Sequence, residues 1–532
     1  MILTTLVVCA LIFSCTLTYP FNNDNALYAY MADLALKGHL PYAGSWDQNF
    51  PGILLIHAAQ ILISGHSQLA FHIFDIALQL VGSFILFKIA ARLYDERAGM
   101  LAAILASLYY VQQGLWMSGE RDTYVSILML AALYFALERK KPFAIGLLCG
   151  LAFLFRPTYA PFGIVFLLFG ILRRGETPPP APSPREGELV TPSLGLAERK
   201  LRPQEQDSGG GKPLNSILSF LIGSLLPSLL LIVLYAFNGS LGDLWDSTIL
   251  FNLKVYSGSG ASFSFWAPVR FYAVSVVAVI VAATSLWNKE RPALYLWTAL
   301  FAASVLSLVV LYRHSVYHYH PAMTLFILLS AVGWIRIGDI IESEFSPKLR
   351  FIIPICVVAF FIFQTFRGNT VQHVLLGIAS GRIHSLEEAY NSYEPSTDFG
   401  VQTQTEVGEY LKLHTHANDT VQMFGPYSYP QYYAGLLTAS RFQTLHAITM
   451  RGTHDTLQSF QSEWRAEYLR DMQQHRPLYF IVCDAPEAFR QYYGGRLGHE
   501  ILQDDFRELG FWLQSYYSPE TKIGSFTLYR RK

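Results

Sequence analysis

The stretch FNNDNALYAYMADLALKGHLPYAGSWDQNFPG, residues 21–52, follows directly on an apolar segment at residues 1–18. Asp24 therefore stands at the mouth of a candidate membrane helix, and Asp47 closes the same polar stretch. A carboxylate is costly to keep at the end of a membrane span, and residues of this kind are usually functional. We predict that acidic side chains form a site at this membrane surface.

The composition is that of a membrane protein with a soluble part. Charged residues make up 15 % of the chain, whereas about 25 % is usual in soluble proteins. The 39 Lys and Arg residues balance the 39 Asp and Glu residues, so the charge does not favour a nucleic-acid partner. The five cysteines form neither a disulfide framework nor a metal-ligand spacing.

Apolar runs predict an α-helical polytopic protein with about 11 spans. Residues 1–18 lack a basic start and a small-residue cleavage site, so we interpret them as an uncleaved first span with a cytoplasmic N-terminus. Ten further segments follow, at about 67–91, 98–113, 122–137, 142–156, 158–172, 214–237, 268–287, 293–312, 319–337 and 351–366. Because 142–156 and 158–172 are short, they could instead form a hairpin that does not fully cross.

Charge sets the predicted orientation. Residues 51–64 are too short to span comfortably, and we place them as an interfacial helix. The clusters of Lys and Arg between the other spans then fall on one side, which the positive-inside rule makes the cytoplasm. This orientation puts the candidate polar residues on the outer face: Asp24, Asp47, Glu120, Arg121, Asp122, Arg156, Arg313 and His314.

Four regions follow from these patterns: a membrane module at 1–172 with a first outer loop at 19–66, a disordered cytoplasmic loop at 173–213, further spans at 214–369, and an outer soluble α/β domain at 370–532. The loop at 173–213 is rich in Pro, Gly and charge and cannot bury a core. In the soluble domain we expect strands within 415–425, 476–484 and 523–531, alternating with helices at about 404–415, 456–475 and 500–509.

Each acidic candidate has an ordinary structural interpretation beside the functional one. Asp24 begins a helix and is a preferred N-cap residue, but capping also fixes a side chain that would act as a general base. Asp47 precedes a Pro-containing turn, and turn chemistry and catalysis are equally open for it. The short loop GERDTY, 119–124, carries Glu120, Arg121 and Asp122. Its charges could simply pair in solvent, yet their packing between aromatic residues at the bilayer edge favours a polar site.

Basic and imidazole side chains gather at two further places. Arg156 lies in FLFRPTYAP, where it could snorkel to the interface or bind a lipid phosphate with its guanidinium fork. The segment YRHSVYHYHP, 312–321, contains Arg313, His318 and His320. No carboxylate stands at helical spacing from these histidines, so phosphate or acceptor binding is favoured over a metal. Solvated interfacial histidine remains the common alternative.

Together these residues resemble the GT-C superfamily of membrane glycosyltransferases, which includes the protein O-mannosyltransferases of glycosyltransferase family 39 and the aminoarabinose transferases. The resemblance covers residues 1 to about 337. It rests on Asp24, on PYAGSWDQNFPG, on the loop ending in Arg121-Asp122, on GLLCGLAFLFRPT at 146–158 and on HYHPAMTLFILL at 318–329. The chain departs from the family pattern at Asn25, Gly44 and Phe50, and has Arg156 where Lys is usual.

The resemblance implies an inverting sugar transfer from a polyprenyl-phosphate donor to a lipid, glycan or protein acceptor on the outer face of a cell membrane, as in a bacterial plasma membrane. Asp24 would be the base, Arg156 with Arg121 or Arg313 would neutralise the phosphate, and Glu120 and Asp122 would orient sugar hydroxyls or those arginines. No cofactor is firmly implied, and a divalent metal is possible. The alternatives are a transporter or flippase of lipid-linked sugars and a non-catalytic binder, although the chain shows no inverted repeat of broken helices.

Overall fold

The computed structural model describes nearly the whole chain, and its ranges are 1–138, 141–172, 213–256, 270–311, 315–345, 349–393, 400–451, 456–485 and 495–532. The predicted disordered loop, apart from its last residue Pro213, lies outside the described residues. The candidates Arg313 and His314 lie outside them as well.

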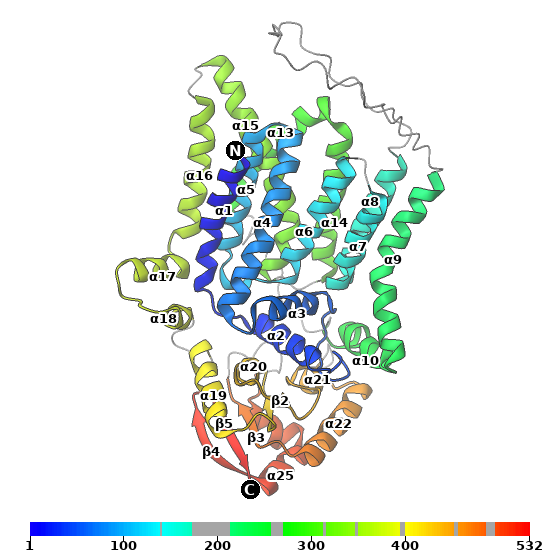
Figure 1. The fold of residues 1–532 in the computed structure, drawn as a ribbon, viewed down its shortest axis with the longest axis vertical. Helices are drawn as coiled ribbons and strands as arrows, with labels where there is room; N and C mark the ends of the chain where they lie inside the picture. The colour runs from blue at the N-terminus through cyan, green and yellow to red at the C-terminus, as the bar shows by residue number, and fades with distance from the viewer. Residues whose placement is uncertain are drawn as a thin grey trace, which may run out of the picture.

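Apolar helices stand side by side in one bundle (Figure 1). They are α1 (Ile2–Phe13), α4 (Gln68–Leu93), α5 (Glu96–Gln112), α6 (Arg121–Leu137), α7 (Pro142–Phe155), α8 (Ala160–Leu172), α9 (Pro213–Phe237), α13 (Val276–Lys289), α14 (Arg291–Leu311), α15 (His320–Glu344) and α16 (Leu349–Phe366). Leu, Ile and Val side chains on the outside of α9 are exposed, as expected where lipid is the solvent.

Length and composition identify fewer spans than the sequence pattern predicted. Among the described residues, 5 helices are long and apolar enough to cross a membrane, or up to 7 if each of two bent pairs is one span. Helices α7 and α8 are shorter apolar helices of 14 and 13 residues. The chain is thus a multi-pass membrane protein, and about 11 spans stays a prediction.

Two short helices lie at one end of the bundle, between it and the C-terminal domain (Figure 1). Helix α2 (Asn23–Leu36) is bent by 88° from the preceding helical segment, and α3 (Gly52–Ser64) lies beside it. The N-cap of α2 is Asn22, whose side chain accepts from the N–H of Asn25, so the expectation of Asp24 as the cap was wrong. Asp24 instead lies in the first turn, where its charge interacts favourably with the helix dipole.

The C-terminal domain is built on a mixed sheet with strand order β2-β1-β3-β5-β4. Strands β1 (Thr420–Phe424), β3 (Tyr479–Cys483) and β5 (Phe526–Arg531) lie within the three segments predicted as strands. Strands β2 (Leu437–Thr438) and β4 (Tyr517–Ile523) were not predicted, because β2 has two residues and β4 is a polar edge strand containing Pro519. Helices α19 (Val401–His414), α22 (Ser459–His475) and α25 (Arg507–Tyr516) pack around the sheet.

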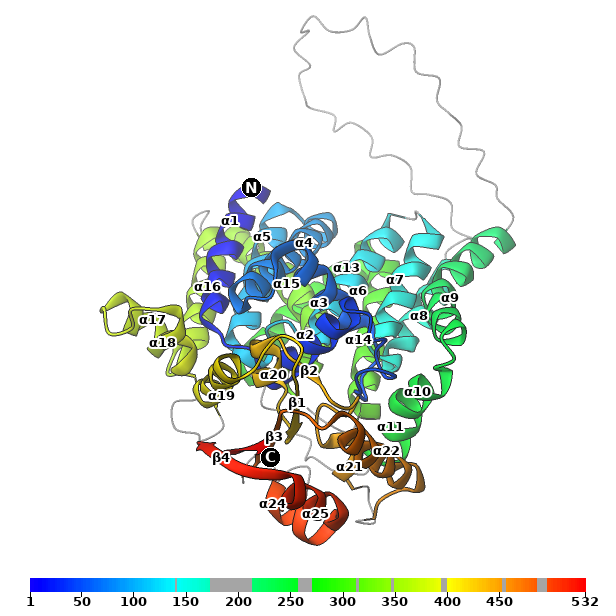
Figure 2. The same cartoon turned by 60° about the horizontal axis from the view of Figure 1, so that its bottom comes forward.

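The C-terminal domain contacts the membrane module through the first outer loop. Trp46 is buried in the core of the C-terminal domain, with ring centroids 4.8 Å from Phe251 and 5.7 Å from Trp464. Phe251 begins α11 (Phe251–Lys254), which lies beside α22 together with α10 (Leu241–Trp245) (Figure 2). Arg441 strengthens the junction, because its Nη1 donates to the carbonyl of Tyr42 and pairs with Asp243. The loop that carries Asp47 is therefore held by the C-terminal domain.

Candidate active site

Residues far apart in the sequence meet where the bundle faces α2 and α3. Asp24 comes from the first turn of α2, Asp47 from the loop that follows it, and Glu120 from the loop before α6. Two further segments complete the site: the break between α7 and the next helical turn, which carries Arg156, and the turn Val316–Tyr319 before α15.

Asp24 is the accessible carboxylate of this group. Its side chain accepts a hydrogen bond of 3.2 Å from the hydroxyl of Tyr317. Asp24 is half-buried, whereas Asp47, Glu120 and Asp122 are buried. A carboxylate that meets an incoming substrate must be reachable, so Asp24 is the acidic side chain in the best position to take a proton.

Asp47 is 2 % exposed and has its own donors. Its Oδ1 accepts from the N–H of Gln48 at 2.8 Å and from Nδ2 of Asn49 at 3.2 Å. Burial raises the pKa of Asp47 from 3.8 to about 6, although nearby Arg121 and the Asn49 hydrogen bond oppose the shift. Asp47 thus titrates close to neutrality.

Arg121 lies between the acidic side chains. Its Nη1 donates to Oδ1 of Asn49, and its guanidinium carbon lies 5.6 Å from the centroid of the Tyr28 ring. The amide of Asn49 in turn donates to the hydroxyl of Tyr28 at 3.1 Å. This arrangement fixes one buried positive charge beside Asp24 and Asp47.

Glu120 is completely buried, and Oε1 accepts a hydrogen bond of 3.0 Å from Asn22. Burial, together with the nearby charge of Asp24, raises the pKa of Glu120 well above its usual value. Glu120 therefore keeps its proton to a higher pH than an ordinary glutamate does. It links the start of α2 to the loop before α6.

Three side chains surround the Asp122 carboxylate. Oδ1 accepts from Nη1 of Arg156 at 2.9 Å and from the hydroxyl of Tyr159, and Oδ2 lies 3.2 Å from Nδ1 of His318. The same His318 nitrogen lies 2.9 Å from Arg156 Nη1. Because an arginine can only donate, the shorter contact favours the His318 tautomer with its proton on Nε2. Asp122 therefore orients Arg156, and Arg156 Nη1 in turn donates to Nδ1 of His318.

The backbone explains how Arg156 reaches this site. Helix α7 ends at Phe155, and Arg156 is extended at φ −164° and ψ 120°. Pro157 follows and disfavours helical geometry at the residue before it. The side chain is 7 % exposed, and only its Nη1 is engaged by described residues. The remaining guanidinium N–H groups are free to bind a ligand.

Of the remaining predicted residues, His320 lies away from this cluster. Nδ1 of His320 lies 2.7 Å from the hydroxyl of Ser126, and its ring packs near Tyr109 and Tyr110 inside the bundle. Arg313 lies outside the described residues. Within the part of the chain that the structure describes, no group of three or more His, Cys, Asp and Glu side chains is placed to hold a metal ion.

The structure also shows a buried carboxylate behind the site that sequence reasoning missed. Asp75 of α4 accepts from Tyr110 at 2.5 Å, from Tyr124 at 3.0 Å and from Gln79 at 3.1 Å. The Tyr110 hydroxyl accepts from the N–H of Gly119 at 3.0 Å, so Asp75 positions the loop before Glu120. Its signal was a single acidic residue inside the apolar run FHIFDIALQL.

Gly119 allows the close approach of this loop. Its φ is +70°, and a Cβ atom there would lie 2.3 Å from the ring of Phe71. Other site residues missed from sequence are uncharged, and nothing in the sequence distinguished them from structural residues: Tyr28, Asn49, Tyr159 and Tyr317.

One protein family matches part of this chain by sequence. Residues 49–178 match the family described as dolichyl-phosphate-mannose-protein mannosyltransferase. The matched region contains Glu120, Arg121, Asp122 and Arg156, and it begins after Asp24 and Asp47. No curated protein matches the chain by sequence.

Solved structures share the fold over almost the full chain. ArnT from Cupriavidus metallidurans, solved with bound undecaprenyl phosphate, is 10 % identical with a TM-score of 0.55, and the match covers 99 % of this chain and 97 % of that chain. The archaeal oligosaccharyltransferase AglB from Archaeoglobus fulgidus, solved with an inhibitory peptide and a dolichol-phosphate, is 12 % identical with a TM-score of 0.53, covering 100 % and 74 %. Residues 49–178 are thus similar to a mannosyltransferase family, and the chain as a whole shares its fold with ArnT and AglB.

Proposed function

We propose that this protein transfers a sugar from a polyprenyl-phosphate donor to a lipid, glycan or protein acceptor, with inversion at the anomeric carbon. The observation that carries the proposal is the half-buried carboxylate of Asp24 beside buried arginines that are partly engaged by protein groups. ArnT and AglB were solved with polyprenyl phosphates, which supports a donor of this class.

Asp24 acts as the general base in the proposed step. It takes the proton from the acceptor hydroxyl as the hydroxyl oxygen attacks the anomeric carbon. The bond from that carbon to the phosphate oxygen breaks, and its electron pair leaves with the lipid phosphate. The Tyr317 hydroxyl, 3.2 Å from Asp24, holds the carboxylate in position.

Arg156 neutralises the phosphate that leaves. Asp122 and His318 hold Nη1, so the Arg156 side chain is already fixed in one conformation. Its remaining N–H groups can then donate to phosphate oxygens. Arg121 supplies a second positive charge near Asp24. Asp47 and Glu120 are buried near Arg121 and help to orient its guanidinium.

For the membrane orientation, we infer that the site and the C-terminal domain face the outside. Both lie at the same end of the bundle (Figure 1). Arg97 and Asp339, which pair at 2.8 Å, belong to the start of α5 and the later part of α15, at the opposite end. Basic residues at that end favour the cytoplasmic side.

The Asp24→Asn variant tests the proposal. The amide cannot act as a base, so transfer of a radiolabelled sugar from a polyprenyl-phosphate donor should be abolished, whereas donor binding and thermal stability should persist. The matched control is Asp33→Asn, on the same helix and outside the site. Transfer at the wild-type rate by Asp24→Asn would remove Asp24 as the base. If the wild-type protein moves the lipid-linked sugar across the vesicle membrane but does not transfer the sugar to an acceptor, the protein is a flippase instead.

A further inference from the structure

The C-terminal domain contains a hollow of about 310 Å³ that takes no part in the proposed transfer. It lies between the π-helical turn Ile501–Asp505, helix α25 and strand β5. Helix α25 is at the end of this domain that is remote from the bundle (Figure 1). A ligand held here would therefore not reach Asp24.

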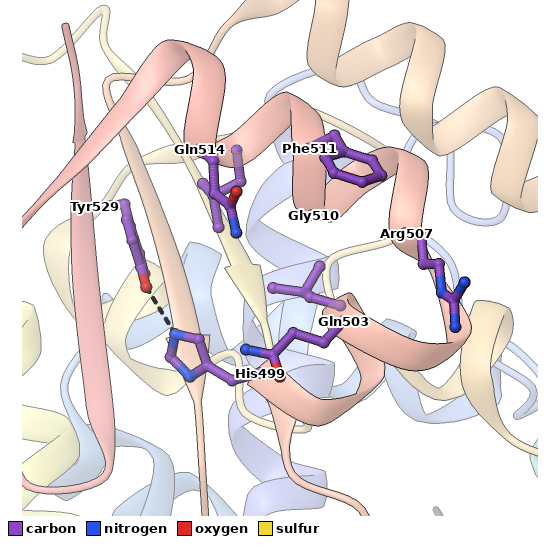
Figure 3. Close-up of a pocket in the computed structure, with 9 residues that line it drawn as sticks. His499, Gln503, Arg507, Gly510, Phe511, Gln514 and Tyr529 are labelled. Atoms are coloured by element: carbon purple, nitrogen blue, oxygen red, sulfur yellow. Dashed lines mark hydrogen bonds between the residues drawn. The ribbon is translucent and has the colours of Figure 1, made fainter.

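One side of the hollow is a fixed chain of three polar side chains. Asp484, which follows β3, lies 2.5 Å from Nδ1 of His499 and also accepts from the His499 N–H at 3.0 Å. Nε2 of His499 lies 2.7 Å from the hydroxyl of Tyr529 (Figure 3). The carboxylate thus sets the orientation of the imidazole, and the imidazole sets that of the phenol.

The shape of the hollow depends on Gly510. A Cβ atom at this position would lie 2.5 Å from the carbonyl oxygen of Leu502, so α25 packs directly on the backbone of the π-helical turn. A π-helical turn is rare and is often found at functional sites. Here the turn places Gln503 opposite Gln514, and Figure 3 shows both amides directed toward His499.

Three polar side chains around the hollow are available to form hydrogen bonds with a ligand. In the described part of the chain, the side chains of Gln503, Gln514 and Arg507 have no hydrogen bond or ion pair with another residue. Phe511 is 69 % exposed and lines the same hollow. Amides and a guanidinium suit a ligand rich in hydroxyl groups, and an aromatic face suits the C–H groups of the same ligand.

We propose that this hollow binds one pyranose ring of a glycan chain, as a sugar-binding subsite separate from the transfer site. Its volume is near the lower end of the roughly 300–1,000 Å³ found for ligand pockets, which suits a single ring. Gln503, Gln514 and Arg507 bind the hydroxyl groups, and Phe511 packs against the ring. Such a subsite holds a glycan on the outer domain while another part of the same or a different molecule is modified.

Saturation-transfer NMR on the full chain in lipid nanodiscs tests the subsite. The probes are methyl glycosides of glucose, mannose, N-acetylglucosamine and glucuronic acid. At least one should receive saturation from the wild-type protein. Loss of one net hydrogen bond weakens binding about tenfold, so the double variant Gln503→Ala/Gln514→Ala should abolish the signal. Phe511→Ala should abolish it too, because the sugar ring loses the aromatic face that it packs against.

Three controls make the result specific. Glu508→Gln changes an exposed residue of α25 that does not line the hollow, and Leu413→Ala removes an apolar side chain that is 81 % exposed elsewhere in the domain. Both should keep the signal. Arg156→Lys should keep it too, because it alters the transfer site and retains a positive charge beside Asp122. The subsite would be overturned by the absence of a signal from all four glycosides, by a signal that survives both hollow variants, or by a signal lost in Arg156→Lys.

Discussion

Gln443 of the C-terminal domain bonds to both backbone polar groups of Trp46 in the first outer loop. Its Nε2 donates to the Trp46 carbonyl at 2.7 Å, and its Oε1 accepts from the Trp46 N–H at 2.9 Å. Trp46 directly precedes Asp47, so the C-terminal domain sets the position of a buried carboxylate in the candidate site. The C-terminal domain is thus a structural part of the site.

We expect Gln443→Ala to lower the turnover number about tenfold, because the loop loses two hydrogen bonds to the C-terminal domain. A tenfold loss corresponds to a rise of about 1.4 kcal/mol in the activation free energy. The Michaelis constant for the donor should change little, since Arg156 is not disturbed. Steady-state transfer assays measure both values. Gln402→Ala, at an exposed position on α19, is the control, and an unchanged turnover number in Gln443→Ala would show that the anchor is dispensable.

Arg156→Ala should weaken donor use more than Arg156→Lys does. Loss of a hydrogen bond to a charged group costs about 1.5–3 kcal/mol, which corresponds to a rise of roughly 10- to 150-fold in the donor Michaelis constant. Lys keeps the charge without the fork geometry and should keep part of the activity.

Arg156→Ala also leaves the Asp122 carboxylate buried without its ion pair, so its thermal stability should fall. The double variant Arg156→Ala/Asp122→Asn should recover stability without recovering donor use. Recovery of donor use in the double variant would mean that Arg156 only compensates the charge of Asp122.

Tyr110→Phe should disturb the loop before Glu120 because it removes both the donor to Asp75 and the acceptor for the Gly119 N–H. We expect a loss of about 1–3 kcal/mol in the free energy of unfolding, together with slower transfer. Thermal unfolding in detergent and transfer assays measure the two effects. Tyr134→Phe, at a half-buried position of α6, should change neither. Normal transfer by Tyr110→Phe would show that the loop is positioned without Asp75.

The raised pKa of Asp47 predicts a pH dependence of stability. Folded protein keeps this carboxyl protonated up to about pH 6, whereas its ordinary pKa is 3.8. Between these values the folded state binds the extra proton, so the contribution of Asp47 to stability is lost as pH rises, by about 3 kcal/mol in total. Asp47→Asn should flatten this part of the profile of melting temperature between pH 4 and 6. An identical profile for the variant and the wild type would mean that Asp47 does not titrate there.

Cysteine labelling tests the orientation. A cysteine introduced at Asn418, in the C-terminal domain, should react with an impermeant maleimide added outside intact cells, whereas one at Ser343, near the end of α15, should react only after permeabilisation. The exposed native thiol Cys356 is first replaced by Ser. The reverse pattern would place the site on the cytoplasmic side.

The sequence by itself determined the class of protein and most of its elements. Long apolar runs predict membrane helices because each run has to match the bilayer, and this is a local property. The short apolar segments that form β1, β3 and β5 are also recognisable from their local sequence. The charged candidates at the end of the bundle next to the C-terminal domain could also be identified from sequence, because a charge beside an apolar run is costly in any fold.

Only the tertiary structure decided which of these residues meet. His318 and His320 are two positions apart, yet His318 joins Arg156 and Asp122 whereas His320 bonds to Ser126. The sequence around Trp46 is typical of a surface loop. In the structure Trp46 is buried in the core of the C-terminal domain, whose other residues come mostly from hundreds of positions later in the chain. Such contacts depend on how helices and domains pack over long sequence separations, and no local pattern of residues encodes that packing.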